Sequence, residues 1–371
     1  MITSRAQKTI GDLLALADIK INGDNAWDIQ VKNDRLFERV LSEGPVGLGE
    51  SYMDGDWDCE ALDEFINKTV RAQLESKIRP IKMLLPIAQA WLINRQRKAR
   101  AFDIGEQHYD IGNDLYTKML DSRMIYTCGY WKDSDNLEDA QVAKLDLICR
   151  KLNLQPGMRV LDIGCGWGSF AGYAAQEYGA SVVGITVSKE QIALAQKRYQ
   201  GKNIEFRYQD YRDVSESFDR IVSVGMFEHV GPKNYRTFMQ VADRCLDDDG
   251  WFLLHTIGTP ISRTAADAWT DKYIFPGGVL PLASQITAAS QGLFLLRDWH
   301  NFADDYDRTL MAWYENFEKS WSQLSGYDER FYRMWRYFLL TGAGAFRANR
   351  GQLWQIVFSK SGVSADYNSV R

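Results

Sequence analysis

The most informative stretch of this sequence has three glycines at alternating positions after a short apolar run. It reads Val160, Leu161, Asp162, Ile163, Gly164, Cys165, Gly166, Trp167 and Gly168. Because glycine has no side chain, a strand that turns into a helix here lets backbone N–H groups approach a ligand closely. A dinucleotide-binding turn would need its third glycine where Ser169 stands. The spacing predicts a βα turn that holds another ligand, or a glycine-rich turn without one.

The acidic residue and the alternate glycines resemble the S-adenosylmethionine (SAM) turn of Rossmann-like methyltransferases. The next predicted strand ends at Thr186 without an Asp or Glu for ribose hydroxyls, which argues against NAD. Thr186 and Gln191 are the polar groups left to contact the adenosine, and Thr186 is alternatively a helix cap. Asp210 follows a third strand and either contacts the adenine amine or caps a helix.

A carboxylate and an imidazole follow two further predicted strands. Glu228 comes just after the strand that ends at Val224, and His255 ends the strand that begins at Trp251. Because neighbouring parallel strands end at one edge of a sheet, we expect both side chains in one crevice. A lone histidine is more often a core residue, but Glu228 beside it favours a functional pair. His229 is expected to point away and to be structural.

Aromatic residues gather in three places that could wall an apolar cavity. The segment from Tyr126 to Trp131 is either a loop over the ligand or an ordinary packed loop. The segment from Trp269 to Leu282 contains Tyr273 and Phe275. A helical stripe runs from Tyr306 through Trp313, and such a stripe is usually core, with Tyr306 the residue most able to face a ligand.

The elements that must position these residues alternate between strands and helices. The predicted strands span 159–163, 181–185, 204–208, 220–224 and 251–256, with later candidates at 293–299 and 353–359. Helical patterns fall between them, including 189–199 and 234–245. This alternation predicts an α/β fold, a doubly wound, seven-stranded sheet that binds its ligand beyond the carboxyl ends of the strands.

The first 75 residues have mostly helical periodicity, with a Gly/Pro-rich turn predicted at Gly44-Pro45. Residues 81–93 are strongly apolar, and basic residues lie on both sides between positions 77 and 100. Such a segment fits either an element that lies on a membrane surface or an interdomain helix followed by a basic linker. It is too short to span a bilayer.

The composition excludes several classes of protein. A net charge of −5 argues against a nucleic-acid-binding protein. A content of 45% hydrophobic residues is typical of a globular protein. The five cysteines are widely spaced and form no metal-ligand cluster, so we expect no metal and no disulfide framework. With no apolar signal segment after Met1, we expect a cytoplasmic protein.

Several motifs together resemble the cyclopropane-fatty-acyl-phospholipid synthase family, a family of SAM-dependent methyltransferases. They cover nearly the whole chain and include 47–55, 106–114, 126–131, 162–168, 222–232, 255–258, 273–277 and 311–314. The resemblance implies a Rossmann-like fold, transfer of a SAM methyl group to the cis double bond of an unsaturated phospholipid acyl chain, and ring closure. Some relatives have a cysteine where this chain has Gly342.

The resemblance also implies roles for particular residues. In this resemblance a bicarbonate ion acts as general base, and the residues expected to bind it are Cys128, Glu228, His255, Tyr306 and the backbone of Ile257. SAM contacts fall on Tyr126, Thr127, Val160, Leu161, Asp162, Ile163, Gly164, Cys165, Gly166, Trp167, Gly168, Thr186, Gln191, Asp210 and Tyr211. The acyl chain is expected to contact Tyr130, Tyr273, Phe275 and Trp313.

We therefore expect a lipid-binding N-terminal domain at 1–93, a basic linker at 94–105 and a catalytic domain at 106–371. The expected partner is an unsaturated phospholipid in the bilayer, with peripheral attachment to the inner face of the cytoplasmic membrane through 77–100. The resemblance suggests a homodimer. Two alternatives remain open: a lipid C-methyltransferase that leaves a methyl branch or a hydroxyl, and a non-catalytic lipid sensor that retains a SAM site.

Overall fold

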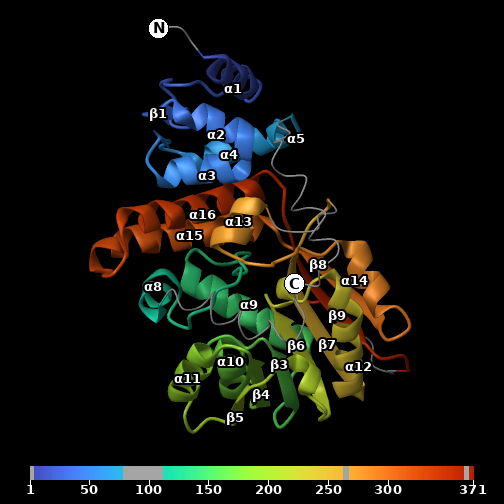
Figure 1. Ribbon diagram of the computed structural model, residues 1–371. Coiled ribbons are helices and arrows are strands. Elements are labelled where there is room, and N and C mark those ends of the chain that lie inside the picture. Colours follow the sequence, from blue (N-terminus) through green and yellow to red (C-terminus); the bar gives the residue numbers. More distant parts are fainter. Residues whose placement is uncertain (1–3, 78–111, 262–266, 363–366) are drawn as a thin grey trace. The chain divides into compact units, whose positions relative to one another are not determined.

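The computed structural model describes residues 4–77, 112–261, 267–362 and 367–371 (Figure 1). They form two compact units. The first contains residues 4–77, 267–276 and 306–351, and the second contains the rest of the described chain. Within these ranges no helix is both long and apolar enough to cross a membrane.

The second unit is built on one seven-stranded sheet in the order β5-β4-β3-β6-β7-β9-β8. Neighbouring strands are parallel except that β9 runs antiparallel to both β7 and β8. The strands are β3 (Arg159–Ile163), β4 (Ser181–Thr186), β5 (Ile204–Tyr208), β6 (Phe218–Val224), β7 (Leu246–Gly258), β8 (Leu295–Asn301) and β9 (Gln352–Ser359). The predicted seven-stranded doubly wound sheet is confirmed.

Helices cover both faces of this sheet (Figure 1). One face packs in a core that includes Val160, Phe170 and Ile148, and the other in a core that includes Leu161, Ile163 and Phe238. Successive strand residues thus enter opposite cores, as the pleat requires. The helices are α8 (Asn113–Met119), α9 (Leu137–Lys151), α10 (Ser169–Glu177), α11 (Lys189–Arg198), α12 (Tyr235–Cys245) and α14 (Ala283–Ser290).

The chain reverses its direction of travel across the sheet between β3 and β6. From β3 it proceeds to β4 and β5 on one side, and then returns to pair β6 with the other side of β3. In open α/β sheets, ligands bind beyond the strand ends at such a switch point. The fold therefore places the expected site beside the carboxyl ends of β3 and β6.

The first unit is mainly helical and includes segments that lie far apart in the sequence. Its helices are α1 (Arg5–Ala15), α2 (Arg35–Glu43), α3 (Pro45–Met53), α4 (Leu62–Arg71), α5 (Leu74–Lys77), α13 (Ala268–Tyr273), α16 (Glu329–Arg347) and all but the first two residues of α15 (Asp304–Ser320). Two short strands, β1 (Gln30–Val31) and β2 (Trp57–Asp58), pair antiparallel.

The predicted turn at Gly44-Pro45 is confirmed at Gly44, which has a φ angle of 60° and separates α2 from α3. Pro45 occupies a first-turn position of the helix, where its missing N–H removes no hydrogen bond. Gly47 and Gly49 lie within this helix at positions where neighbouring atoms leave no room for a side chain. A Cβ atom would lie 2.2 Å from the Arg39 carbonyl oxygen at Gly47 and 2.4 Å from the Trp269 ring at Gly49. Close packing, rather than a turn, explains these glycines.

The first unit also differs from the expected N-terminal domain, because it takes in α16 and most of α15. In α16, Arg347 bonds Asp63 at 2.7 Å and Asp307 at 2.8 Å, and Arg333 donates to the Tyr52 carbonyl oxygen at 2.6 Å. A side chain at Gly344 would meet the backbone of Asp63. The predicted basic linker at 94–105 and the apolar segment at 81–93 lie outside the described residues.

Candidate functional site

The glycine turn has the backbone conformation that its spacing predicts. Gly164, Gly166 and Gly168 have φ angles of 85°, 54° and 82°, a region that residues with a side chain rarely adopt. Gly168 is the N-cap of α10, so the turn leads directly from β3 into that helix. The amides of Gly164 and Cys165 both donate to the Ile185 carbonyl oxygen, at 2.9 and 3.0 Å. These bonds fix the turn against β4.

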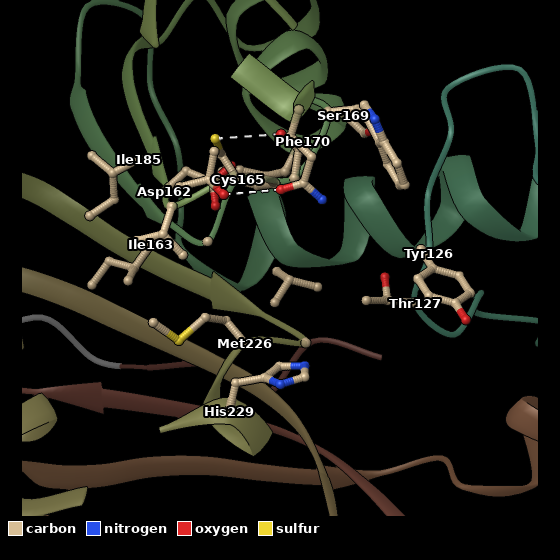
Figure 2. Close-up of a pocket in the computed structure, with 18 of the residues that line it drawn as sticks. Tyr126, Thr127, Asp162, Ile163, Cys165, Ser169, Phe170, Ile185, Met226 and His229 are labelled. Atoms are coloured by element: carbon tan, nitrogen blue, oxygen red, sulfur yellow. Dashed lines mark hydrogen bonds between the residues drawn. The ribbon is translucent and has the colours of Figure 1, made fainter. Parts of the chain in front are cut away.

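This turn forms one wall of a cavity of about 200 Å³. In Figure 2 Tyr126 and Thr127 lie on one side of the cavity, Asp162, Ile163 and Cys165 on another, and Met226 and His229 below. All the predicted SAM contacts line it except Val160, Leu161 and Gly168. The first two are strand residues buried in the two cores, and Gly168 packs against Phe206.

The polar groups opposite the turn are held in place by bonds to one another. Thr186 Oγ1 donates to Gln191 Oε1 at 3.0 Å, and the N-cap of α11 is Ser188 rather than Thr186. Asp210 caps the short helix that follows it, accepting from the Arg212 amide at 2.9 Å and from the Arg212 guanidinium at 2.9 Å. The capping alternative for Asp210 is thus confirmed, and its side chain also borders the cavity.

Beside the cavity, Glu228 is joined to strand β7. Its Oε1 accepts a hydrogen bond from the Ile257 amide at 2.6 Å, and its backbone carbonyl accepts from Val279 at 2.9 Å. Burial raises the pKa of Glu228 to about 7. The other carboxylate oxygen, Oε2, is buried and has no hydrogen-bond partner among the described residues. A buried polar atom in this state calls for a ligand or a proton.

His255 lies two residues before Ile257 on the same strand, and is opposite Val224 in the β6–β7 register. It is 1% exposed, and burial lowers the pKa of its imidazole well below the ordinary value, so the ring is neutral. Its Nε2 is buried without a partner in the described part of the chain. The structure thus brings Glu228, His255 and the Ile257 amide to the end of β7, as the topology predicted.

Sequence comparison identifies the family. The family model described as mycolic acid cyclopropane synthetase matches residues 96–356, more than half of the chain. The chain belongs to this family.

Individual relatives agree with the family match. The chain is 56% identical over 351 residues to a cyclopropane-fatty-acyl-phospholipid synthase of Escherichia coli, covering 94% of this chain and 92% of the relative. It is 32% identical over 354 residues to the tuberculostearic acid methyltransferase UfaA1 of Mycobacterium tuberculosis, covering 89% and 82%. The cyclopropane synthase MmaA2 of M. tuberculosis superposes with a TM-score of 0.66 at 33% identity, covering 70% of this chain and 98% of that one. The predicted class, a SAM-dependent methyltransferase, is confirmed.

Among the residues that the resemblance to this family implied, Cys128 is fully buried and lies in the loop before α9. Its thiol donates to the Gly129 carbonyl oxygen at 3.1 Å. The preceding residue, Thr127, is close to Gly225, which follows β6. A Cβ atom added to Gly225 would lie 2.5 Å from the Thr127 methyl group. Gly225 in turn donates to the His255 carbonyl oxygen at 2.9 Å. A short chain of contacts therefore links the Cys128 loop to the end of β7.

The remaining predicted residues of the family site fall on both units. Tyr130 is in the second unit, where its ring lies edge-on to His300 and Phe302. In the first unit, the Tyr306 ring stacks on Phe346 at 4.5 Å between centroids, and the Tyr273 hydroxyl donates to Glu50 at 2.9 Å. Trp313 and Phe275 pack within that same unit, against Tyr306 and Phe338 respectively. The role of Tyr306 toward bicarbonate and the roles of the other four residues toward the acyl chain stay predictions.

A buried lysine of the cavity wall was not predicted from the sequence. Lys144 is 1% exposed and donates to Thr127 Oγ1 at 2.8 Å, and burial lowers its pKa to about 8. Burial raises the pKa of Asp162 to about 7, although the nearby positive charge of Lys144 acts to lower it. A signal was present: Lys144 shares the buried face of α9 with Ala140, Leu137 and Ile148, at helical spacing.

His229 also lines the cavity, so the expectation that it points away is wrong (Figure 2). Residues 227–229 form a single turn of 3₁₀-helix, in which side chains three residues apart eclipse one another. His229 therefore lies on the same side as Met226, which also lines the cavity. Burial lowers the pKa of His229 to about 4, so a neutral ring faces the cavity.

Proposed function

We propose that this chain converts unsaturated phospholipid acyl chains into cyclopropane acyl chains, with SAM as the methyl donor. The observation that carries the proposal is the unpartnered, buried Glu228 Oε2 and His255 Nε2 beside a cavity built on a SAM-type glycine turn. The similarity to the E. coli phospholipid synthase over nearly the whole chain supports a phospholipid substrate.

The chemistry sets strict demands on the site. An alkene is a weak nucleophile, so it must be held about 3–3.5 Å from the methyl carbon in a dry pocket. Methyl transfer releases S-adenosylhomocysteine and leaves a carbocation on the acyl chain, which water would trap as an alcohol. Aromatic faces stabilise such a cation and exclude water. We assign that part to Tyr126, Tyr130, Tyr273, Phe275 and Tyr306.

Ring closure then requires loss of one proton from the transferred methyl group. Bound bicarbonate supplies a small, weak base that SAM does not readily alkylate. The residues fit such an ion, because Glu228 Oε2 can accept its O–H and His255 Nε2 can donate to it, and both atoms are buried without partners in the described chain. Cys128, Tyr306 and the backbone of Ile257 complete the proposed set.

The proposed function is tested by incubating the full chain with methyl-labelled SAM and vesicles of phospholipid with cis-unsaturated acyl chains. We expect label in the acyl chains, and none with vesicles of fully saturated phospholipid. Absence of label from unsaturated lipid, with SAM binding intact by calorimetry, would contradict the proposal and favour a lipid sensor.

The bicarbonate assignment needs its own experiment. In buffer depleted of carbon dioxide we expect turnover to fall and to recover in proportion to added bicarbonate. Sodium chloride at the same ionic strength is the control for screening. Full activity after depletion would remove bicarbonate from the proposal and leave the methyl transfer standing.

We also propose that the chain binds the membrane surface through residues 77–100 and acts as a homodimer. Each Lys or Arg near an anionic leaflet contributes about 1 kcal/mol. Sedimentation with anionic vesicles should therefore exceed sedimentation with zwitterionic vesicles and weaken in salt. Replacing Arg95, Arg97, Lys98 and Arg100 with serine should remove the difference. Equal binding to both vesicles would contradict the electrostatic part, and analytical ultracentrifugation tests the dimer.

A further inference from the structure

Strand β9 places Gln355 between two histidines. Gln355 is opposite His255 in the β7–β9 register and opposite His300 in the β8–β9 register. Residues directly opposite one another in antiparallel strands share a face of the sheet. The three side chains therefore form a row on one face, and Gln355 in the middle is 0% exposed. A buried glutamine at such a position needs a reason.

The amide of Gln355 contacts the imidazole of His255. Gln355 Nε2 lies 3.3 Å from His255 Nδ1. In this orientation of the Gln355 amide, Nε2 is the donor and His255 Nδ1 is the acceptor. Since the His255 ring is neutral, its single hydrogen is then on Nε2. The hydrogen bond to one ring nitrogen thus decides what the other nitrogen can do.

Among the described residues, no other side chain forms a hydrogen bond with the His255 ring. The ring of Phe302 lies edge-on at 5.8 Å between centroids, and it limits where the imidazole can move but not its tautomer. Lys144 and Lys151 act on His255 as positive charges and favour the neutral ring without choosing a nitrogen. Lys151 itself bonds His300 Nδ1 at 3.1 Å, on the far side of the row.

We propose that Gln355 is a positioning residue, which donates to His255 Nδ1 and so keeps the imidazole hydrogen on Nε2, where it is donated to the bound anion. The inference rests on the proposed function, because it takes the anion to be the bicarbonate placed beside Glu228. An Nε2–H donor matches that ion, whereas the opposite tautomer would present a lone pair to an anion.

The first test uses the unaltered protein with ¹⁵N-labelled histidine. The chain has only four histidines, so the His255 ring can be assigned from His255→Asn, or by elimination from variants of His108, His229 and His300. We expect a protonated Nε2 and an unprotonated Nδ1 for His255. Hydrogen on Nδ1 in the unaltered protein would overturn the inference, whatever the activity.

The second test compares three variants of β9. Gln355→Met removes the donor at similar volume, Gln355→Glu replaces it with an acceptor, and Gln352→Met is the matched control. Gln352 is on the same strand, but its Oε1 accepts from Trp354 and Asn301 at 3.2 Å each and not from His255. In Gln355→Glu we expect hydrogen on His255 Nδ1, which a purely structural role would not cause.

Both Gln355 variants should raise KM for bicarbonate about tenfold, the effect of losing one hydrogen bond, and leave the affinity for SAM unchanged. Gln352→Met should change neither quantity. If Gln355→Glu keeps the tautomer and the KM of the unaltered protein, the inference is wrong. If the tautomer shifts as expected but turnover shows no bicarbonate dependence in any variant, the bicarbonate assignment fails and the positioning of His255 by Gln355 stands.

Discussion

The Ile257 amide donates a hydrogen bond to Glu228 Oε1 over 2.6 Å and so joins the turn after β6 to the end of β7. The bond satisfies one carboxylate oxygen and leaves Oε2 as the buried atom without a partner in the described chain. It anchors the Glu228 carboxylate to β7. The same strand carries His255, two residues before Ile257. Glu228 is therefore positioned by the backbone, which makes its substitution informative.

Glu228→Gln should reduce kcat by about 10²-fold or more at saturating bicarbonate, because the amide places an NH₂ group at the Oε2 position, which cannot accept the bicarbonate O–H. The amide retains an oxygen for the Ile257 hydrogen bond, so the local fold should persist. We expect the Kd for SAM, measured by calorimetry, to stay within about twofold. Unchanged turnover in saturating bicarbonate would show that the assigned role of Glu228 is wrong.

The same variant should alter the pH dependence of stability. Burial raises the Glu228 pKa from 4.5 to about 7, so between these values the folded chain holds a proton that the unfolded chain releases. The Glu228 contribution to the free energy of unfolding therefore falls as pH rises through this window. At ~1.4 kcal/mol per pKa unit, the loss is about 3 kcal/mol by pH 8.

Denaturant unfolding at pH 4.5 and pH 8 measures this difference. We expect Glu228→Gln to gain stability relative to the unaltered protein as pH rises, because the variant has no charge to bury. Other titrating groups, including Asp162 and Lys144, are common to both proteins and cancel in the comparison. A stability difference that does not vary with pH would contradict a raised Glu228 pKa.

Gly166→Ala should weaken SAM binding, whereas an equally strained alanine outside the cavity should not. Gly166 has φ 54° and open space around a built Cβ atom, so alanine there is strained by about 1–2 kcal/mol without a clash. Gly157 offers a matched control outside the cavity, with φ 85° and equally open space. Both variants should lose similar stability, but only Gly166→Ala should raise the Kd for SAM, by about tenfold or more. Equal Kd values would show that no ligand approaches the turn backbone.

Lys144→Met should raise the Kd for SAM about tenfold, because Thr127 loses a charged donor at 2.8 Å and Asp162 loses a nearby positive charge. Lys151→Met is the control, since Lys151 is also buried on α9 but bonds Asp298 and His300 instead. It should leave the Kd for SAM unchanged. If both variants weaken SAM equally, the effect belongs to α9 as a whole and not to Lys144.

Much of the sheet could be predicted because its strands are short apolar runs between turn residues. Strands β3 and β5 span the predicted residues, and β7 extends beyond its prediction to Leu246 and Gly258. Glu228 and His255 could be placed together because parallel topology alone brings strand ends to one edge. These parts follow from local pattern and from rules of chain topology.

Other features depend on packing that no local pattern records. The helical glycines of α3 follow from contacts with Arg39 and Trp269, the second of which lies more than 200 residues away in the sequence. The orientation of His229 depends on a single 3₁₀ turn, since an α-helical or extended backbone would point it elsewhere. The composition of the first unit likewise depends on α16 packing against α4, which sequence spacing does not predict.

The structure of the lipid product tests the account most directly. Unsaturated phospholipid is treated with the full chain and SAM carrying a ¹³C-labelled methyl group, and the acyl chains are analysed by NMR and mass spectrometry. We predict that the label appears as a ring CH₂ carbon, with loss of the olefinic protons and a mass gain of one CH₂ group. Three other products would contradict ring closure: label in a methyl branch, label in an alkene methylene group (C=CH₂), or label in a methyl group beside a new hydroxyl group.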